Sequence, residues 1–355
     1  EVWKASGHLA EFSDPMVDHK PTGERFRADQ VPDDLRKEDL TEPRHFNLMF
    51  ETNIGPVKNE NSAVYLRPET AQGIFVNFEN VLRTMRAKLP FGIANIGKSF
   101  RNEITPGQFI FRTREFEQME IEFFCKEEDQ EHWFNFWIKK RLEWYKSLGI
   151  SEDKLRIRTH EEGELAHYAS KTSDIEFMYP WGWGELEGIA NRGTFDLTSH
   201  ERESGKDLTY FDPESNEKIN PVVIEPAGGL TRTLFAILCS NYDEDTVSDT
   251  TRTLFRFNFD IAPVQIAILP LSKKDNLINI SKEIKNNLQM SFRTEIDITQ
   301  SIGKRYRRQD EIGTPYCITV DFETVDDKSV TIRNRDTMDQ ERVEINKLNH
   351  YFENI

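Results

Sequence analysis

Two patterns of apolar and polar residues follow one another along the chain. Residues 1–261 outline strands with alternating side chains, glycine-punctuated turns and amphipathic helices. From Ala262 onward, short apolar runs that indicate buried strands alternate with helical stretches, which is typical of an α/β domain. A chain of 355 residues is long enough for two domains. The pattern therefore predicts one domain over residues 1–261 and a second over residues 262–355.

The clearest alternation lies in residues 97–124, which predict two strands joined by a tight turn at Thr105-Pro106-Gly107. Proline presets φ and glycine tolerates positive φ, so this tripeptide suits a turn. Side chains on a strand point alternately to opposite faces. The back of this hairpin is apolar and carries Phe111, Met119, Ile121 and Phe123. The front is polar and carries Arg101, Glu103, Arg112, Arg114, Phe116, Gln118, Glu120 and Glu122.

That polar front suits an anionic ligand with a ring, such as a nucleotide. Guanidinium groups bind phosphate through paired N–H donors, an aromatic ring stacks on a base, and carboxylates accept hydrogen bonds from amines. The alternative is a solvated strand face on which arginines and glutamates form cross-strand ion pairs. The residue pattern of the hairpin alone leaves both interpretations open.

Other stretches of the first domain predict further elements. Residues 64–88 predict a strand, a turn at Pro68 and an amphipathic helix, and residues 127–148 predict a helix whose aromatic stripe packs into the core. Residues 181–200 predict a glycine-punctuated strand and loop, and residues 221–239 predict a strand, a glycine turn and an apolar helix.

Polar stretches and the second domain complete the expected order of elements. A charged insertion or linker is predicted at residues 28–44, and an acidic linker at residues 243–253. In the second domain, strands are predicted at residues 263–270, 294–298, 316–322 and 329–333. Helices are predicted near residues 273–288 and 338–352. This order indicates an α/β domain with a largely parallel sheet.

Composition narrows the class of protein. At 37% hydrophobic and 30% charged residues, the chain is expected to be soluble and globular, and no apolar run approaches the ~20 residues of a membrane helix. Cys125, Cys239 and Cys317 lie far apart, without metal-ligand spacing or a disulfide framework, which fits a reducing, cytoplasmic location. His8 and His19 also lack the paired spacing of metal ligands.

Charge is distributed unevenly. The net charge of −16 argues against a nucleic-acid partner, but residues 262–355 carry 14 Lys and Arg against 15 Asp and Glu. A basic cluster within these residues comprises Lys304, Arg305, Arg307 and Arg308. Such a patch can bind an RNA backbone locally. The alternative is a solvated helix face.

Longer motifs carry a resemblance to a known family. Phe100-Arg-x-Glu103, a loop, and Arg112-x-x-x-Phe116-x-x-x-Glu120 resemble motif 2 of class II aminoacyl-tRNA synthetases. Gly229-Leu-Thr-Arg232 resembles their motif 3, whereas motif 1 is not present. The sequences of residues 67–75 and of residues 187–200 resemble those of glycyl-tRNA synthetases in particular. Residues 303–315 resemble the anticodon-binding domain shared by the glycyl, threonyl, prolyl and histidyl enzymes.

The resemblance implies a fold. Residues 1–261 are expected to form an α+β catalytic domain, in which helices flank the antiparallel sheet of class II synthetases. Residues 262–355 are expected to form an α/β anticodon-binding domain with a mixed sheet. The family also implies a homodimer.

The resemblance also implies roles for individual residues. Arg101 is expected to hold the α-phosphate of ATP, Arg232 the γ-phosphate, and Phe116 to stack on adenine, with Glu103 and Arg112 beside the nucleotide. Magnesium is expected to bridge the phosphates, with no ligands assigned. Glycine binding is expected from Glu69, Glu120 and Glu225 around the ammonium group, Arg192 on the carboxylate, and Ala227. At Ala227 the family often has a serine, and the loss of one neutral hydrogen bond costs about 1 kcal/mol.

The implied activity is ATP-dependent ligation of glycine to tRNA(Gly) through a glycyl-adenylate. Two alternatives stay open: another class II synthetase of the threonyl or prolyl type, and a non-catalytic paralogue that binds nucleic acid. The intact set of Arg101, Glu103, Phe116 and Arg232 favours an enzyme, because a binding module has no need of it.

Overall fold

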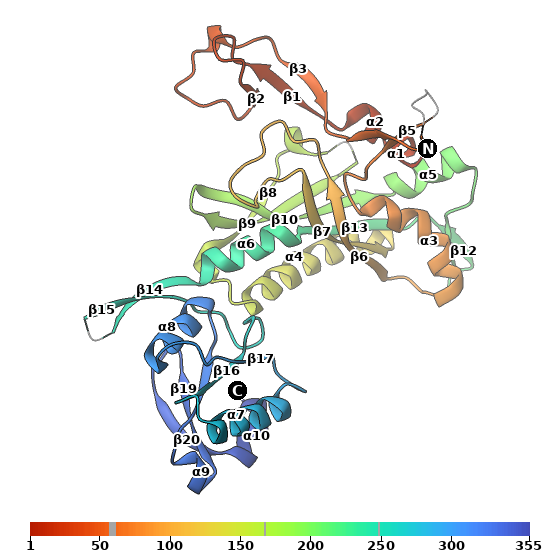
Figure 1. The fold of residues 1–355 in the computed structure, drawn as a ribbon. Coiled ribbons are helices and arrows are strands. Elements are labelled where there is room, and N and C mark those ends of the chain that lie inside the picture. Colours follow the sequence, from red (N-terminus) through yellow and green to blue (C-terminus); the bar gives the residue numbers. More distant parts are fainter. Residues whose placement is uncertain (57–61, 167, 248) are drawn as a thin grey trace. The chain divides into compact units, whose positions relative to one another are not determined.

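The computed structural model describes residues 1–56, 62–166, 168–247 and 249–355, and they form two compact units (Figure 1). The first unit comprises residues 1–144 and 152–236, and the second comprises residues 145–151 and 237–355. No helix among the described residues combines the length and the apolar character needed to cross a bilayer.

A six-stranded sheet forms the centre of the first unit (Figure 1). All neighbouring strands are antiparallel. In spatial order the strands are β6 (Phe91–Phe100), β7 (Glu115–Cys125), β13 (Val222–Gly229), β10 (Gly182–Gly193), β9 (Lys171–Tyr179) and β8 (Leu155–Thr159). This arrangement confirms the antiparallel sheet that the resemblance implies.

Helices pack on both faces of the sheet. Adjacent residues of β7 point to opposite faces, so neighbouring phenylalanines contact different helices. The ring of Phe124 packs against Phe75 and Phe78 of α3 (Ala71–Met85). The ring of Phe123 packs on the other face against Trp133 of α4 (Gln130–Ser147). Two further helices follow strands directly: α5 (Phe195–Ser204) after β10, and α6 (Leu230–Asn241) after β13.

Short elements precede the sheet. Two helical turns, α1 (Val2–Ala5) and α2 (His8–Glu11), lead into a small sheet in the order β2-β1-β3. Its strands are β1 (Ser13–Asp18), β2 (Arg25–Arg27) and β3 (Arg44–Asn47). The charged stretch predicted as an insertion connects β2 to β3 and contains the 3₁₀ turn η1 (Lys37–Asp39) and an isolated bridge between Leu40 and His19. Strands β4 (Glu51–Asn53) and β5 (Ala63–Tyr65) then form a hairpin.

The second unit contains a mixed five-stranded sheet. Strands β17, β16 and β18 are parallel, and β19 and β20 add antiparallel strands, which confirms the mixed sheet. Their bounds are β16 (Ile266–Pro270), β17 (Thr294–Ile296), β18 (Tyr316–Val320), β19 (Ser329–Asn334) and β20 (Gln340–Glu344). The helices are α7 (Asp275–Leu288), α8 (Ile302–Ile312), α9 (Thr324–Asp327) and α10 (Leu348–Glu353). Ile268, Leu277 and Ile318 lie in its core.

The structure differs from the predicted hairpin at residues 97–124. The first strand ends at Phe100 and the second begins at Glu115, so residues 101–114 form a loop rather than extended strands around a tight turn. Gln108 and Phe109 adopt positive φ angles of 57° and 56°, and Gly107 pairs with Arg112 in an isolated bridge. Arg101, Glu103 and Arg112 therefore lie on a loop and not on a strand face.

The predicted acidic linker at residues 243–253 is wrong. The chain forms a hairpin of β14 (Tyr242–Val247) and β15 (Thr250–Phe255). Arg252 and Leu254 are buried while Thr251 and Thr253 are exposed, so the alternation is present but uses a charged residue inside. Arg252 can be buried because Asp245 and Asp310 accept its hydrogen bonds.

Two other predictions of secondary structure fail. The expected final helix at residues 338–352 begins as strand β20, an edge strand whose apolar content is too low to show a period of two. The 3₁₀ turn η5 (Ile345–Lys347) and the short helix α10 follow it. The glycine-punctuated segment at residues 181–200 ends in helix α5 rather than in a loop.

Gly313 gives a test of the packing in the second unit. It ends α8 with a φ of +84°, and a Cβ there would lie 2.3 Å from Cδ2 of Phe257. We expect Gly313→Ala to lower the free energy of opening of α8 by about 2–3 kcal/mol, measured by hydrogen exchange of its amides.

Gly303 is the matched control within the same helix. A Cβ at Gly303 would meet no atom within 4 Å, so Gly303→Ala should stabilise α8 by up to about 1 kcal/mol. Equal protection in both variants would contradict the packing described for Gly313.

Candidate active site

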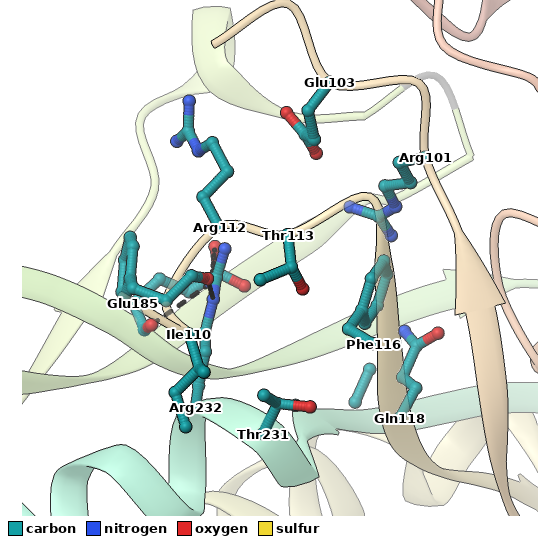
Figure 2. Close-up of a pocket in the computed structure, with 13 residues that line it drawn as sticks. Arg101, Glu103, Ile110, Arg112, Thr113, Phe116, Gln118, Glu185, Thr231 and Arg232 are labelled. Atoms are coloured by element: carbon teal, nitrogen blue, oxygen red, sulfur yellow. Dashed lines mark hydrogen bonds and ion pairs between the residues drawn. The ribbon is translucent and has the colours of Figure 1, made fainter. Parts of the chain in front are cut away.

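A cavity of about 80 Å³ opens between the 101–114 loop, the central strands and the start of α6 (Figure 2). Loop residues Arg101, Glu103 and Arg112, strand residue Phe116 and helix residue Arg232 all line it. The structure thus brings together every residue that the sequence assigns to ATP. We call this space the first cavity.

A second cavity of about 250 Å³ adjoins the first and shares Arg101, Gln118, Glu185 and Ala227 with it. Its floor carries Glu69, Glu120 and Glu225. Four of the five residues that the sequence assigns to glycine therefore line one space. The fifth, Arg192, donates a hydrogen bond to Glu225 from beneath it.

The arginines of the first cavity are held in place by their surroundings. Arg101 donates from Nε to the carbonyl of Pro68 at 3.1 Å, and its guanidinium lies 5.3 Å from the ring centre of Phe116 (Figure 2). Arg232 donates from Nε to the carbonyl of Phe111 at 3.1 Å and packs 4.3 Å from the ring of the same residue. Such contacts fix a guanidinium while leaving other N–H groups for an anion.

Glu185 is a site residue that the sequence analysis missed. It lines both cavities from β10, and its carboxylate lies 3.2 Å from Nη1 of Arg232 (Figure 2). The charge of Arg232 lowers the pKa of Glu185, which keeps this carboxylate ionised. The glycine-rich sequence around Trp183 indicated a strand, but only the register of β10 shows that Glu185 faces the cavity.

Arg192 is the cation at the base of the second cavity. Its guanidinium is 1% exposed and donates from Nε and Nη2 to both oxygens of Asp196, at 2.7 and 2.8 Å, as well as to Glu225. The ring of Tyr168 lies 3.8 Å from the guanidinium carbon. The structure therefore uses much of Arg192 to hold protein carboxylates, and Asp196 is a partner that the sequence analysis did not identify.

Glu69 is ionised despite its burial. Burial opposes its charge, but His8, Arg192 and a hydrogen bond from Gln72 together lower the pKa of Glu69 below its ordinary value. Nε2 of His8 lies 3.2 Å from the Glu69 carboxylate. His8, which showed no metal spacing in the sequence, is thus an electrostatic partner of the site.

Glu69, Glu120, Glu122 and Glu225 form a buried carboxyl cluster. The three members other than Glu69 hold protons more tightly than a free glutamic acid does. Burial and the neighbouring charges of Glu69 and Glu225 raise the pKa of Glu120 to about 8. Burial raises the pKa of Glu225 to about 7, although Arg192 opposes that shift. Burial and Glu225 also raise the pKa of Glu122 well above the ordinary value for glutamic acid. The cluster holds more carboxyl groups than cations, so it is suited to receive another cation.

The basic cluster of the second unit is only partly available. Arg305 is buried and donates to the carbonyls of Pro270, Asp297 and Gln300. Arg308 donates to Asp297 at 2.9 Å. Lys304 is exposed and Arg307 is half-buried. Two of the four candidate residues for tRNA therefore serve contacts within their own unit.

Across the parts of the chain that the structure describes, no group of three or more His, Cys, Asp or Glu side chains is arranged to hold a metal ion on its own. Among the described residues, Cys125 and Cys317 are buried thiols that form no disulfide.

Comparison with known proteins gives consistent relatives. A profile described as the tRNA synthetase class II core domain (G, H, P, S and T) matches residues 50–241, and one described as an anticodon binding domain matches residues 265–355. The chain is 50% identical to a glycine–tRNA ligase of Caldanaerobacter subterraneus subsp. tengcongensis, in an alignment that covers 99% of this chain and 83% of that protein. A glycine–tRNA ligase of Ruminiclostridium cellulolyticum is 51% identical, with 100% and 83% covered. One of Lachnoclostridium phytofermentans is 49% identical, with 99% and 84% covered.

Glu122 tests the electrostatics of the cluster. Its side chain is fully buried, and neither oxygen has a hydrogen-bond partner among the described residues. A raised pKa means that the folded state binds this proton more tightly than the unfolded state, so stability from this group falls as pH rises above about 4.5. Glu122→Gln removes that loss. Between pH 5 and pH 8, the stability of the variant relative to the unmodified chain should rise by more than about 1 kcal/mol.

The measurement is urea unfolding followed by tryptophan fluorescence. All six tryptophans lie in the first unit, which also contains Glu122, so the signal reports on the unfolding of that unit. Glu117→Gln is the control, because Glu117 is exposed on the same strand and its replacement should give no such pH dependence. A relative stability of Glu122→Gln that stays constant with pH would show that the buried carboxyl does not retain its proton.

Proposed function

The chain belongs to the glycine–tRNA ligases, a family of class II aminoacyl-tRNA synthetases, and we propose that its two adjoining cavities form and hold a glycyl-adenylate. The reaction is ATP-dependent ligation of glycine to tRNA(Gly). One observation supports the assignment of the site. The residues assigned to ATP and the buried carboxylates line adjoining cavities, and Arg101 and Ala227 line both.

The first cavity holds ATP in this proposal. Arg101 binds the α-phosphate, Arg232 the γ-phosphate, and Phe116 stacks on the adenine ring, with Glu103 and Arg112 beside the nucleotide. The attacking group is the glycine carboxylate, which is already a nucleophile, so the first step needs no general base. Positioning and charge stabilisation by the two arginines lower its barrier. Pyrophosphate leaves as the glycyl carboxylate bonds to the α-phosphorus.

The second cavity holds glycine. Glu69, Glu120 and Glu225 are buried and accept hydrogen bonds from the ammonium group, and in this proposal they surround it and leave no room for a side chain on the amino acid. Arg192 carries five N–H groups, of which three donate to Asp196 and Glu225, so two remain for the substrate carboxylate. Ala227 offers no hydroxyl, and a water or a neighbouring donor takes that place.

Magnesium fits the donor chemistry of the first cavity. Mg²⁺ prefers hard oxygen ligands and is usually held by one or two carboxylates together with substrate phosphates. Glu103 and Glu185 supply carboxylates in the first cavity. A bound Mg²⁺ would neutralise phosphate charge, while the arginines orient the phosphates for in-line attack.

The remaining assignments follow from the family. We place the domain boundary after residue 261, with residues 262–355 reading the anticodon, and the match of an anticodon binding domain to residues 265–355 supports this. Lys304 and Arg307 are the members of the basic cluster best placed to contact RNA. A cytoplasmic homodimer is the expected form of the enzyme.

Pyrophosphate exchange tests this function directly. We expect exchange of pyrophosphate into ATP with glycine, and none with alanine, serine, threonine or proline. Arg101→Ala should lower the glycine-dependent rate by about 10²–10³-fold, because it removes a preorganised positive group at the reacting phosphate.

Arg202→Ala is the matched control for that variant. Arg202 is an exposed arginine of the same unit, and its replacement should leave the exchange rate unchanged within about twofold. Exchange with threonine or proline would assign the pocket to another class II enzyme. Absence of exchange with all five amino acids would favour the non-catalytic paralogue.

A further inference from the structure

Two titratable side chains in the second cavity have no role in adenylate formation. His160 follows β8 and Asp174 lies on β9, and both line the cavity that also contains Glu69, Glu120 and Glu225. Nε2 of His160 lies 2.7 Å from Oδ2 of Asp174. The pair therefore stands at the edge of the space where the adenylate is held.

The pair is fixed in position. The side chains of His160 and Asp174 are 19% and 10% exposed. The backbone N–H of His160 donates to the carbonyl of Thr172 at 3.0 Å, which ties it to β9. On the other side, Oδ1 of Asp174 lies 3.5 Å from the place where a Cβ on Gly188 would stand, so the carboxylate packs closely over that glycine.

This geometry prepares the imidazole to accept a proton. When Nε2–H donates to a carboxylate, the neutral ring carries its lone pair on Nδ1. No described residue forms a hydrogen bond with Nδ1 of His160. The Asp174 carboxylate also stabilises the imidazolium that forms on protonation, which is how a carboxylate supports a general base.

The two steps of the reaction differ in their need for a base. The first step uses a carboxylate nucleophile and releases no proton. The second step uses a hydroxyl of the terminal ribose of tRNA, and its proton must leave as the ester forms. A group that accepts this proton is expected to contribute about 10²–10⁴-fold to the rate.

We propose that His160, oriented by Asp174, is the general base of glycyl transfer to tRNA. The ribose oxygen bonds to the glycyl carbonyl carbon, and the bond between that carbon and the phosphate oxygen breaks. AMP leaves with the electron pair, and the hydroxyl proton passes to Nδ1 of His160. This inference rests on the proposed function, because it requires the adenylate in the second cavity.

Charged neighbours of the pair set its pH dependence. Arg158 from β8 is ion-paired with Glu164, and Glu185 approaches from β10. Burial and the charge of Glu185 raise the pKa of Asp174 to about 6, although the hydrogen bond from His160 opposes the shift. The ionised Asp174 is the form that orients His160, so the transfer rate should rise with pH as Asp174 loses its proton near pH 6.

The test separates the two steps on the full chain. Enzyme with preformed glycyl-adenylate is mixed with tRNA(Gly), and transfer is followed in a single turnover, while pyrophosphate exchange is measured in parallel. We expect His160→Gln to slow transfer by 10²–10⁴-fold and to change exchange by less than about threefold. His132→Gln, an exposed histidine on α4, is the control and should change neither rate.

Asp174→Asn distinguishes positioning from a structural effect. It should slow transfer and remove the rise of the transfer rate near pH 6, because the variant has no carboxyl group at this position to lose a proton. Transfer by His160→Gln within threefold of the unmodified rate would overturn the proposal, and so would an equal loss of both activities. If the unmodified chain lacks glycine-dependent exchange, the proposed function fails and the inference fails with it.

Discussion

One buried guanidinium, that of Arg192, holds together side chains that would otherwise repel one another. It joins strand β10 to helix α5 through Asp196 and to strand β13 through Glu225. Burial of a carboxylate without a partner is costly, and loss of one member of a buried ion pair typically costs about 3–5 kcal/mol. The position of Glu225, and with it the floor of the second cavity, therefore depends on Arg192. The same cation lies against the rings of Tyr168 and Phe75.

The positive charge supplied by Arg192 is smaller than the negative charge gathered around it. Glu69 is kept ionised with the help of His8, but Glu120 and Glu225 titrate near neutral pH, and the pKa of Glu122 lies well above its ordinary value. Protons therefore balance the cluster when no ligand is bound. The ammonium group of a ligand can replace these protons, and its attraction to the carboxylates is stronger in a buried site than in water. This balance favours the binding of a primary amine.

The sequence motifs assigned Arg101, Phe116 and Arg232 to one nucleotide site, and in the structure the three residues line one cavity. The sequence analysis placed Arg101 and Arg112 on strands, since a loop that bends through positive φ at Gln108 and Phe109 has no clear local signal. It could not identify Glu185, whose inward orientation depends on the register of β10.

Long-range ion pairs explain the other misses. Asp196 and Arg252 are charged residues whose burial is possible only with partners from elsewhere in the chain. A reading based on apolar periodicity treats such residues as exposed, which is why the β14–β15 hairpin was predicted as a linker. Nothing in the sequence distinguishes His160 and Asp174 from exposed polar residues. Their side chains come into contact because β8 and β9 are paired.

We expect the buried carboxyl cluster to exchange protons for the ammonium group of glycine when glycine binds. The most direct measurement is calorimetric titration of glycine into the enzyme at pH 7, repeated in buffers of different ionisation enthalpy. The dependence of the observed heat on the buffer gives the number of protons exchanged on binding. We predict the release of about one proton per glycine bound, reduced in Glu120→Gln. Binding without proton release, or with proton uptake, would contradict the claim.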